Sequence, residues 1–409
     1  MNAKNSVEST SINIAIISDL HCHHSSHPLG INSHLLTDSL RNPAAEHPIQ
    51  SFIEQVIPDF KENIDYLFCP GDITNGTDPQ GLISGWDFIN EIAHEMSTKD
   101  VIATIGNHDI DSRQQISKDE VFRVPKKIGK SYPFKSKELR DEYWANGYCF
   151  VEFPDVRVLV INSCHFHRSK DTAVQGKVDK AQIEEIKKYV EKREDSKIQV
   201  ALCHHHPMEY PLPNPQAEDV LENSADLLKG LIESNFDVFV HGHKHYPSLE
   251  YHPCGGKRIP ILSSGSFSAK SGLMMHGMFN SFHMMTITKT GNNQAVGKIR
   301  TWEYLEGNGW RRANGGPPNL PSYTGFGSNK NIKDICLEIN QLYQSKNSVE
   351  IRWDKIEVEI PEVQYLTPKE LVDLEKTLDD IYELEVNYSK ERLPSKIGKK
   401  YNPNEDENR

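Results

Sequence analysis

The chain has 409 residues, 37% of them hydrophobic, and a formal net charge of −12 at pH 7. Such an acidic chain is not expected to coat nucleic acid, because that affinity depends on neutralising phosphates. No stretch approaches the roughly 20 apolar residues of a membrane span, and the first residues lack the pattern of a signal peptide. Seven scattered cysteines with no CxxC pair argue against a disulfide framework, so we expect a protein of the reducing cytoplasm.

Residues 1–305 alternate apolar, β-branched runs with amphipathic segments. The runs predict strands, and the segments with helical spacing predict helices at 81–96, 179–194 and 225–235. The predicted strands lie within 12–21, 64–76, 100–111, 156–166, 197–207, 236–245, 258–266 and 283–290. This order is typical of one large α/β domain, in which ligands bind at the carboxyl ends of the strands.

The composition of the sequence changes after residue 305. A Gly-, Pro- and Asn-rich linker leads to a predicted helix at 332–344, an alternating run at 349–360 that predicts a strand, and a predicted helix opening with Thr367, Pro368 and Glu370. An apolar stripe on this last helix packs against its own domain or, alternatively, contacts a partner; it comprises Leu371, Leu374, Leu378 and Ile381. We therefore predict a catalytic domain at 1–305, an α+β extension at 306–388, open to protein partners or self-association, and a disordered tail at 389–409.

Polar residues recur at the ends of the predicted strands in a fixed order. The set is Asp19-x-His21, Gly71-Asp72, Gly106-Asn107-His108-Asp109, a histidine among 204–206, and Gly242-His243-Lys244-His245. Asp, Asn and His supply oxygen and nitrogen donors that suit Mn, Fe, Zn or Co. A carboxylate that bridges two such ions about 3.5–4 Å apart would allow an in-line phosphoryl displacement. The pattern therefore predicts a two-metal hydrolase.

The three consecutive histidines leave one choice open. Side chains alternate along a strand, so His204 and His206 share one face and His205 takes the other. Alternation alone selects either His205 or the pair that flanks it.

The five motifs, spanning about residues 19 to 245, resemble the pattern of the calcineurin-like metallophosphoesterases. The resemblance implies a four-layer α-β-β-α sandwich of two mixed sheets, followed here by the C-terminal α+β extension. It also implies one metal held by Asp19, His21, His245 and bridging Asp72. The second would be held by Asp72, Asn107, His205 and His243, since the family's usual H-x-P selects His205, with His204 as the alternative. His108 would point at the substrate phosphate and protonate the leaving oxygen.

The stretch "GDITNG" distinguishes branches of the family. It lacks the Asp-Arg-Gly of protein phosphatases and the tyrosine of purple acid phosphatases, and Asn75 stands where a carboxylate would orient His108. The sequence therefore resembles the phosphodiesterase branch of the family. This resemblance implies two divalent metal ions, Mn foremost, and attack by a metal-bridging hydroxide on a small nucleotide diester or cyclic nucleotide. The alternatives are a DNA or RNA nuclease, a phosphomonoesterase, or a metal-bound sensor or scaffold that recruits a partner through the C-terminal region.

A basic stretch at 123–140 follows the Gly-Asn-His-Asp motif. It carries seven Lys or Arg residues against one acidic residue, Glu138. A loop that leaves a metal-bearing strand end begins near the metals, so its positive charges can attract an anionic substrate to the site. We expect Asn107, His108, Lys126, Lys127 and Lys130 to contact the substrate; a solvated loop is the alternative for the three lysines.

Overall fold

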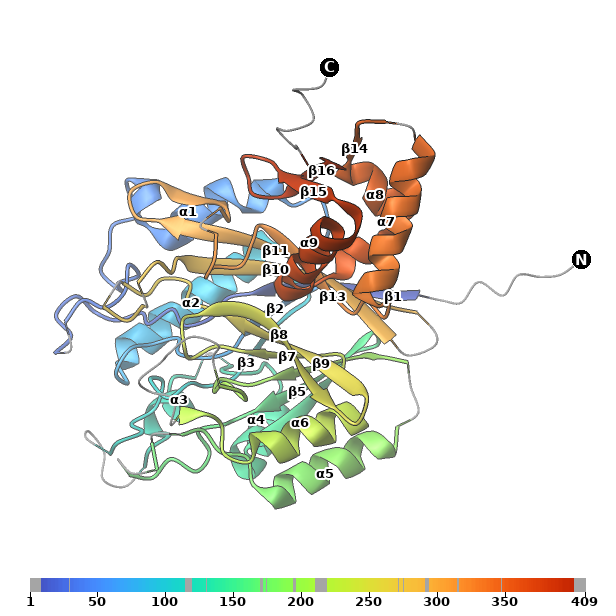
Figure 1. Cartoon of the computed structure of the whole chain (residues 1–409). Coiled ribbons are helices and arrows are strands. Elements are labelled where there is room, and N and C mark those ends of the chain that lie inside the picture. Colours follow the sequence, from blue (N-terminus) through green and yellow to red (C-terminus); the bar gives the residue numbers. More distant parts are fainter. Residues whose placement is uncertain are drawn as a thin grey trace, which may run out of the picture.

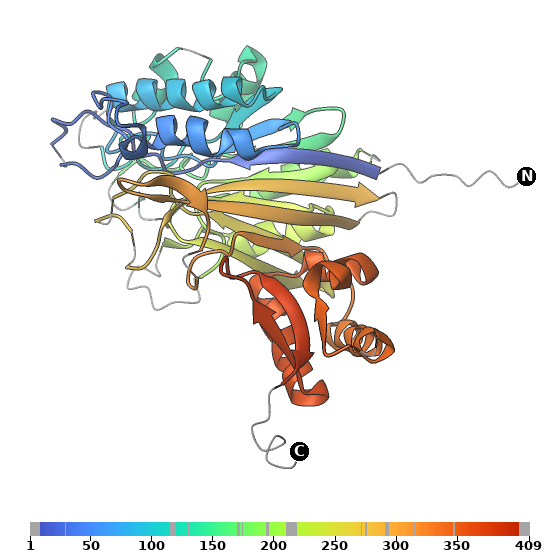
Figure 2. The same ribbon diagram turned by 90° about the horizontal axis from the view of Figure 1, so that it is seen from above.

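The computed structural model describes residues 9–28, 30–114, 120–129, 131–169, 172–173, 175–193, 196–209, 219–270, 272–274, 276–290, 294–314, 316–346 and 348–400. Two large mixed sheets face each other, and helices lie outside them (Figures 1 and 2). The predicted α-β-β-α sandwich with a C-terminal α+β extension is confirmed. No helix of the described ranges has the length and apolar character needed to cross a membrane.

The first sheet places β1 and β2 side by side and parallel. Its order is β12 (Gly309–Arg312), β11 (Gln294–Leu305), β10 (Asn280–Thr290), β1 (Ser9–Ile16), β2 (Tyr66–Cys69) and β3 (Asp100–Ala103), and β13 (Tyr323–Phe326) also pairs with β11. Because β12 and β13 lie beyond residue 305, this sheet includes strands from both sides of the predicted domain boundary. The division of the chain into domains stays a prediction. Helices α1 (Pro48–Gln55), α2 (Pro79–Glu95), α3 (Arg123–Lys127) and α4 (Lys137–Asn146) belong to this half of the chain.

The second sheet is buried on both faces. Its order is β4 (Tyr148–Glu152), β5 (Val156–Ile161), β6 (Ile198–Leu202), β7 (Val238–His241), β9 (Lys257–Ser264) and β8 (Pro247–Cys254). Val158 and Val160 join the core between the sheets, whereas Leu159 and Ile161 pack with α5 (Lys180–Glu191) and α6 (Ser224–Glu233). This two-sided burial explains the continuous apolar runs of the sequence.

The C-terminal residues build a smaller unit with its own core, which stands off the sandwich (Figure 2, orange to red). Its elements are α7 (Ile332–Lys346), β14 (Glu350–Arg352), α8 (Trp353–Glu359), α9 (Pro368–Tyr382), β15 (Leu384–Tyr388) and β16 (Pro394–Lys399), and the strands pair in the order β14-β16-β15. The predicted start of α9 is confirmed, since Thr367 and Glu370 form a reciprocal capping box.

Two predictions for this unit were wrong. The run 349–360 is a strand for only three residues and then becomes α8, and β16 lies inside the predicted disordered tail. The polar residues of β16 hid the strand because its buried contribution is small: Ile397 and Gly398 are buried, and its other residues are half-buried or exposed. Residues 401–409 lie outside the described residues.

Candidate metal centre

The centre begins where β1 and β2 end side by side. Asp19 and Asp72 follow these two strands, and both side chains are buried. The backbone N–H of Asp19 donates to the Gly71 carbonyl oxygen, and that of His21 donates to the Asp72 carbonyl oxygen; both distances are 3.0 Å. The two loops therefore leave the sheet together and bring both carboxylates to one place.

An unusual backbone conformation turns these side chains inward. Five site residues have a positive φ, which non-glycine residues rarely adopt; they are Asp19 (52°), His21 (48°), Asp72 (50°), His243 (78°) and His245 (54°). Such strain persists where the surrounding structure enforces it and is concentrated at functional sites. Gly242 permits the approach, because a Cβ there would lie 2.3 Å from Asp19 Oδ2.

Asp19, His21 and His245 form the first group of donors. His21 Nε2 lies 2.8 Å from His245 Nε2, and His245 Nε2 lies 3.4 Å from Asp19 Oδ1. The Leu273 carbonyl accepts from His245 Nδ1 at 2.8 Å, which orients the ring so that Nε2 faces the carboxylate. Burial and the neighbouring His245 hold the pKa of His21 well below its usual value. A neutral imidazole of this kind is suited to bind a metal.

Asp72, Asn107, His204 and His243 form the second group. Asn107 Oδ1 lies 3.1 Å from His204 Nε2 and 3.0 Å from His243 Nδ1. Asp72 Oδ2 lies 3.3 Å from His204 Nε2 and 3.8 Å from His21 Nε2, so this carboxylate adjoins both groups. Burial opposes the charged form of His204, yet the Asp72 carboxylate raises the pKa of that imidazole to about 9. The centre therefore favours a positive charge beside Asp72, and its oxygen and nitrogen donors fit divalent transition metals.

The structure corrects the choice among the three histidines. His204, not His205, contacts Asp72 and Asn107; its Nδ1 lies 2.9 Å from the Pro70 carbonyl oxygen. His205 turns the other way, with Nδ1 2.8 Å from Ser163 Oγ, and lies in a buried group with Cys164 and His167. The H-x-P pattern selects His205, whereas the ring beside Asp72 belongs to His204, three residues before Pro207.

His108 lies at the junction of the two groups, where one of its ring nitrogens, a ring nitrogen of His21 and a carboxylate oxygen of Asp72 lie within 4.8 Å of one another. The His108 ring meets that of His21 edge to face at a centroid separation of 4.8 Å, and the backbone N–H of His108 donates to Asp72 Oδ1 at 2.8 Å. Asn75 Oδ1 lies 2.9 Å from His108 Nδ1. This contact with the Asn75 amide orients the His108 ring.

Two of the three lysines expected to contact the substrate lie within the described residues. Lys126 and Lys127 are exposed on α3. The Lys126 ammonium lies 5.6 Å from the ring centre of Phe122 and 3.9 Å from Glu120 Oε1. Lys130 lies outside the described residues. The substrate clamp stays a prediction.

Sequence reasoning missed Asp219. Its Oδ2 lies 3.4 Å from His243 Nε2, and it is also paired with Lys244 and with His206, whose Nε2 is 3.6 Å from Asp219 Oδ1. No strand or glycine motif marks Asp219, and it follows residues that the structure leaves undescribed, so the sequence carries no signal for it.

Imidazole, carboxylate and amide groups gathered at the strand ends of two facing sheets define a candidate dinuclear metal centre. Residues 12–247, more than half of the chain, match the model of the calcineurin-like phosphoesterases, and the chain belongs to this family. The family implies a metal-dependent phosphoesterase with two divalent ions. A second model, described as wHTH-Calcineurin_assc, matches residues 324–380.

Solved structures show more distant likenesses. A purple acid phosphatase from yellow lupin (Lupinus luteus) seeds is 15% identical with a TM-score of 0.47, over 75% of this chain and 53% of that chain. The present chain thus spans about half the length of the lupin protein. Phosphopantetheinyl hydrolase from Mycobacterium tuberculosis is 15% identical with a TM-score of 0.33, over 63% of this chain and 90% of that chain. No curated protein matches the sequence.

Proposed function

We propose that this protein is a two-metal phosphodiesterase acting on a small nucleotide diester or cyclic nucleotide. The observation that carries the proposal is the convergence of both groups of donors on Asp72, whose Oδ2 lies within 3.8 Å of His21 Nε2 and 3.3 Å of His204 Nε2. A single carboxylate between two donor groups is what a bridged metal pair requires.

Each ion would have its own protein ligands. Asp19, His21 and His245 would hold one ion, and Asn107, His204 and His243 the other, with Asp72 shared. Bound divalent ions of this kind polarise phosphoryl oxygens and lower the pKa of a water molecule. The donors fit Mn, Fe, Zn or Co, and we propose Mn.

The protein's own residues position the substrate and manage its protons. His108 stands at the edge of the centre, held by Asn75, where it is placed to donate a proton to the leaving oxygen of the substrate. The absence from "GDITNG" of the arginine and tyrosine typical of monoester-cleaving branches supports a diester. The chain's net charge of −12 favours a small diester over long DNA. Seven free cysteines support a reducing, cytoplasmic location.

A substrate panel tests the proposal. Mn-loaded protein is assayed with bis(p-nitrophenyl) phosphate, p-nitrophenyl phosphate, 2′,3′- and 3′,5′-cyclic nucleotides and single-stranded DNA. We expect the diester and at least one cyclic nucleotide to be cleaved with higher kcat/KM than the monoester, and Asp72→Asn to abolish both turnover and two-ion binding. Turnover of the monoester alone would point to a phosphatase, and preferred cleavage of DNA to a nuclease. Folded protein that binds two ions but cleaves nothing would favour the sensor or scaffold.

A further inference from the structure

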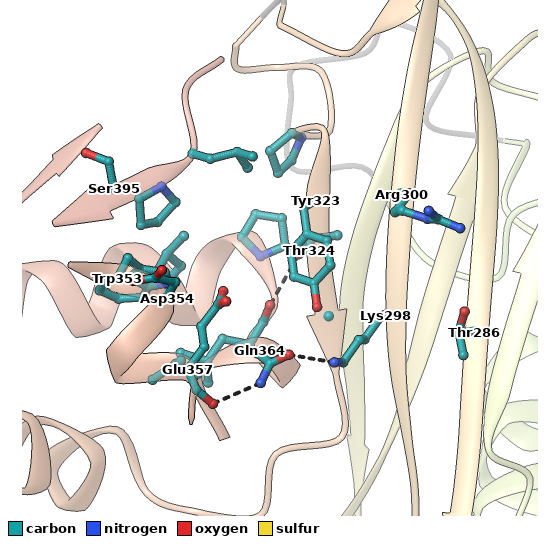
Figure 3. A pocket seen from close by; sticks show the side chains of 18 of the residues that line it. Thr286, Lys298, Arg300, Tyr323, Thr324, Trp353, Asp354, Glu357, Gln364 and Ser395 are labelled. Carbon is teal, nitrogen blue, oxygen red and sulfur yellow. Dashed lines mark hydrogen bonds between the residues drawn. The ribbon is translucent and has the colours of Figure 1, made fainter. Parts of the chain in front are cut away.

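A cavity of about 690 Å³ lies between the first sheet and the C-terminal unit (Figure 3). Its floor includes Thr286, Lys298 and Arg300 of β10 and β11, on the face opposite Ile287 and Ile299 of the core. Its other walls come from β13, α8, the 3-10 helix Pro361–Tyr365 and the start of β16. It shares no residue with the metal centre, and its volume is typical of small-molecule sites.

Aromatic and apolar groups form much of the wall. Figure 3 shows Tyr323 on one side, Trp353 on the other, and Glu357 and Gln364 between them. Leu366, Leu371 and Pro394 add apolar surface. Flat side chains on two sides of a cavity favour a ligand with a flat ring, because such rings stack and exclude water.

Lys298 supplies a cation with spare hydrogen-bonding capacity. Its Nζ donates to Gln364 Oε1 at 2.5 Å, and among the described residues no carboxylate forms an ion pair with it. An ammonium group has three donors; one bonds to the Gln364 amide, and Nζ also lies 5.2 Å from the ring centre of Tyr365, so hydrogen-bonding capacity remains for a ligand. Burial lowers the pKa of Lys298, and the negative charge of Glu357 offsets this only in part. By contrast, Arg300 already pairs with Glu62 at 2.7 Å, and Arg352 with Asp354.

Glu357 supplies the opposite charge. It lines the same cavity and forms no ion pair with any described residue, and hydrogen bonding to the Trp353 side chain stabilises its charged form. Burial raises the pKa of its carboxyl group, partly offset by the positive charge of Lys298. The cavity thus presents an acceptor at Glu357 and donors at Lys298, with aromatic walls beside them.

We propose that this cavity binds a small ligand with an anionic group, a flat ring and ring N–H donors, as in a guanine nucleoside monophosphate. The anionic group would contact Lys298, the ring would lie between Tyr323 and Trp353, and its N–H groups would donate to Glu357. A ligand held by both units would bridge them. The inference does not depend on the proposed phosphodiesterase activity.

Calorimetric titration of the metal-loaded protein with guanosine 5′-monophosphate tests this site. We expect binding that Lys298→Met weakens at least tenfold, with Lys298→Gln as a second variant should Met impair folding. Glu357→Gln should weaken binding of the nucleotide and leave binding of ribose 5-phosphate unchanged. Guanosine and ribose 5-phosphate should each bind at least tenfold more weakly than the whole nucleotide. Lys188→Met, on the exposed face of α5, serves as the matched control and should change nothing.

Variants at each site separate this cavity from the metal centre. Asp72→Asn should retain nucleotide binding, and Lys298→Met should retain the wild-type rate of bis(p-nitrophenyl) phosphate cleavage. Binding that Asp72→Asn abolishes and Lys298→Met preserves would place the nucleotide at the metal centre and overturn the proposal. Absence of binding up to millimolar nucleotide in folded wild-type protein would overturn it as well.

Discussion

His204 contacts Asp72 and Asn107, whereas its neighbour His205 turns toward Ser163. Replacing His204 by Ala removes a nitrogen donor from the centre, so we expect loss of at least one metal ion. A metal ion contributes several kcal/mol of transition-state stabilisation, which corresponds to a loss of about 100-fold or more in kcat/KM. Elemental analysis and diester hydrolysis measure both effects.

His205→Ala is the matched control, since both rings are fully buried. We expect this variant to lose stability while keeping two ions per folded chain. A larger metal loss from His205→Ala than from His204→Ala would restore the register that the H-x-P pattern predicts.

Asn75 positions His108 through the 2.9 Å contact between Oδ1 and Nδ1. We expect Asn75→Ala to lower kcat about 10- to 100-fold, as removal of an orienting partner usually does, with metal content unchanged. The double variant with His108→Ala should be no slower than His108→Ala alone, because Asn75 acts only through that ring. Steady-state kinetics of the four proteins test the coupling. Independent, multiplicative losses would show that Asn75 acts on the substrate or metals directly.

At the scale of elements, α9 contains a carboxyl group whose charged form is disfavoured by burial. The half-buried Glu375 has an oxygen, Oε1, with no hydrogen-bond partner among the described residues, and burial raises its pKa to about 7. In the unfolded chain the pKa is about 4.3. The folded state therefore holds the proton more tightly, and stability falls as the pH rises from about 4.3 through 7.

Glu375→Gln removes this pH dependence because the amide stays neutral. We expect the variant to melt a few degrees above wild type at pH 8 and to differ much less at pH 5. Calorimetric Tm values at the two pH values test this expectation. The exposed Asp373→Asn on the same helix is the control and should shift Tm equally little at both. An equal Tm gain for Glu375→Gln at both pH values would contradict the titration.

The elements show where sequence patterns suffice. Strands buried on both faces, such as β5 and β6, produce apolar runs in which only Arg157 and Gln199 are polar. The Thr367–Glu370 capping box marks the start of α9. The stripe on α9 packs into its own unit at Leu374 and Leu378, while Ile381 stays exposed. In the run 349–360, the spacing of Trp353, Ile356 and Ile360 fits one face of a helix and not the alternation of a strand, and α8 forms over Trp353–Glu359. The loops that bear the candidate ligands could be located from the sequence. The turn of the buried His205 toward Ser163 depends on a contact that the local sequence pattern does not encode.

At the scale of the whole molecule, the C-terminal unit matches a wHTH-type model but carries an acidic third helix. In DNA-binding helix-turn-helix proteins the recognition helix enters the major groove. Here α9 has five acidic residues against two lysines: Glu370, Asp373, Glu375, Asp379 and Asp380 against Lys369 and Lys376. Repulsion from phosphates therefore disfavours DNA at this helix.

We expect duplex DNA to bind no more tightly than the micromolar range typical of non-specific complexes, even at 50 mM salt. Fluorescence anisotropy with a labelled duplex measures this. Asp373→Lys combined with Asp380→Lys, two exposed positions on α9, should create salt-sensitive binding. Tight, salt-dependent binding by wild type that persists in Asp72→Asn would contradict the expectation.

The twelve-residue strand β11 has its outer edge divided between two short partners. β13 pairs with Gly297–Arg300 and β12 with Trp302–Leu305. An open edge of a long strand is a template on which other molecules can add strands. The C-terminal region therefore acts as a cover that keeps the sheet from growing between molecules. A chain ending before Tyr323 should self-associate, visible as a concentration-dependent rise in light scattering, and full-length protein should not.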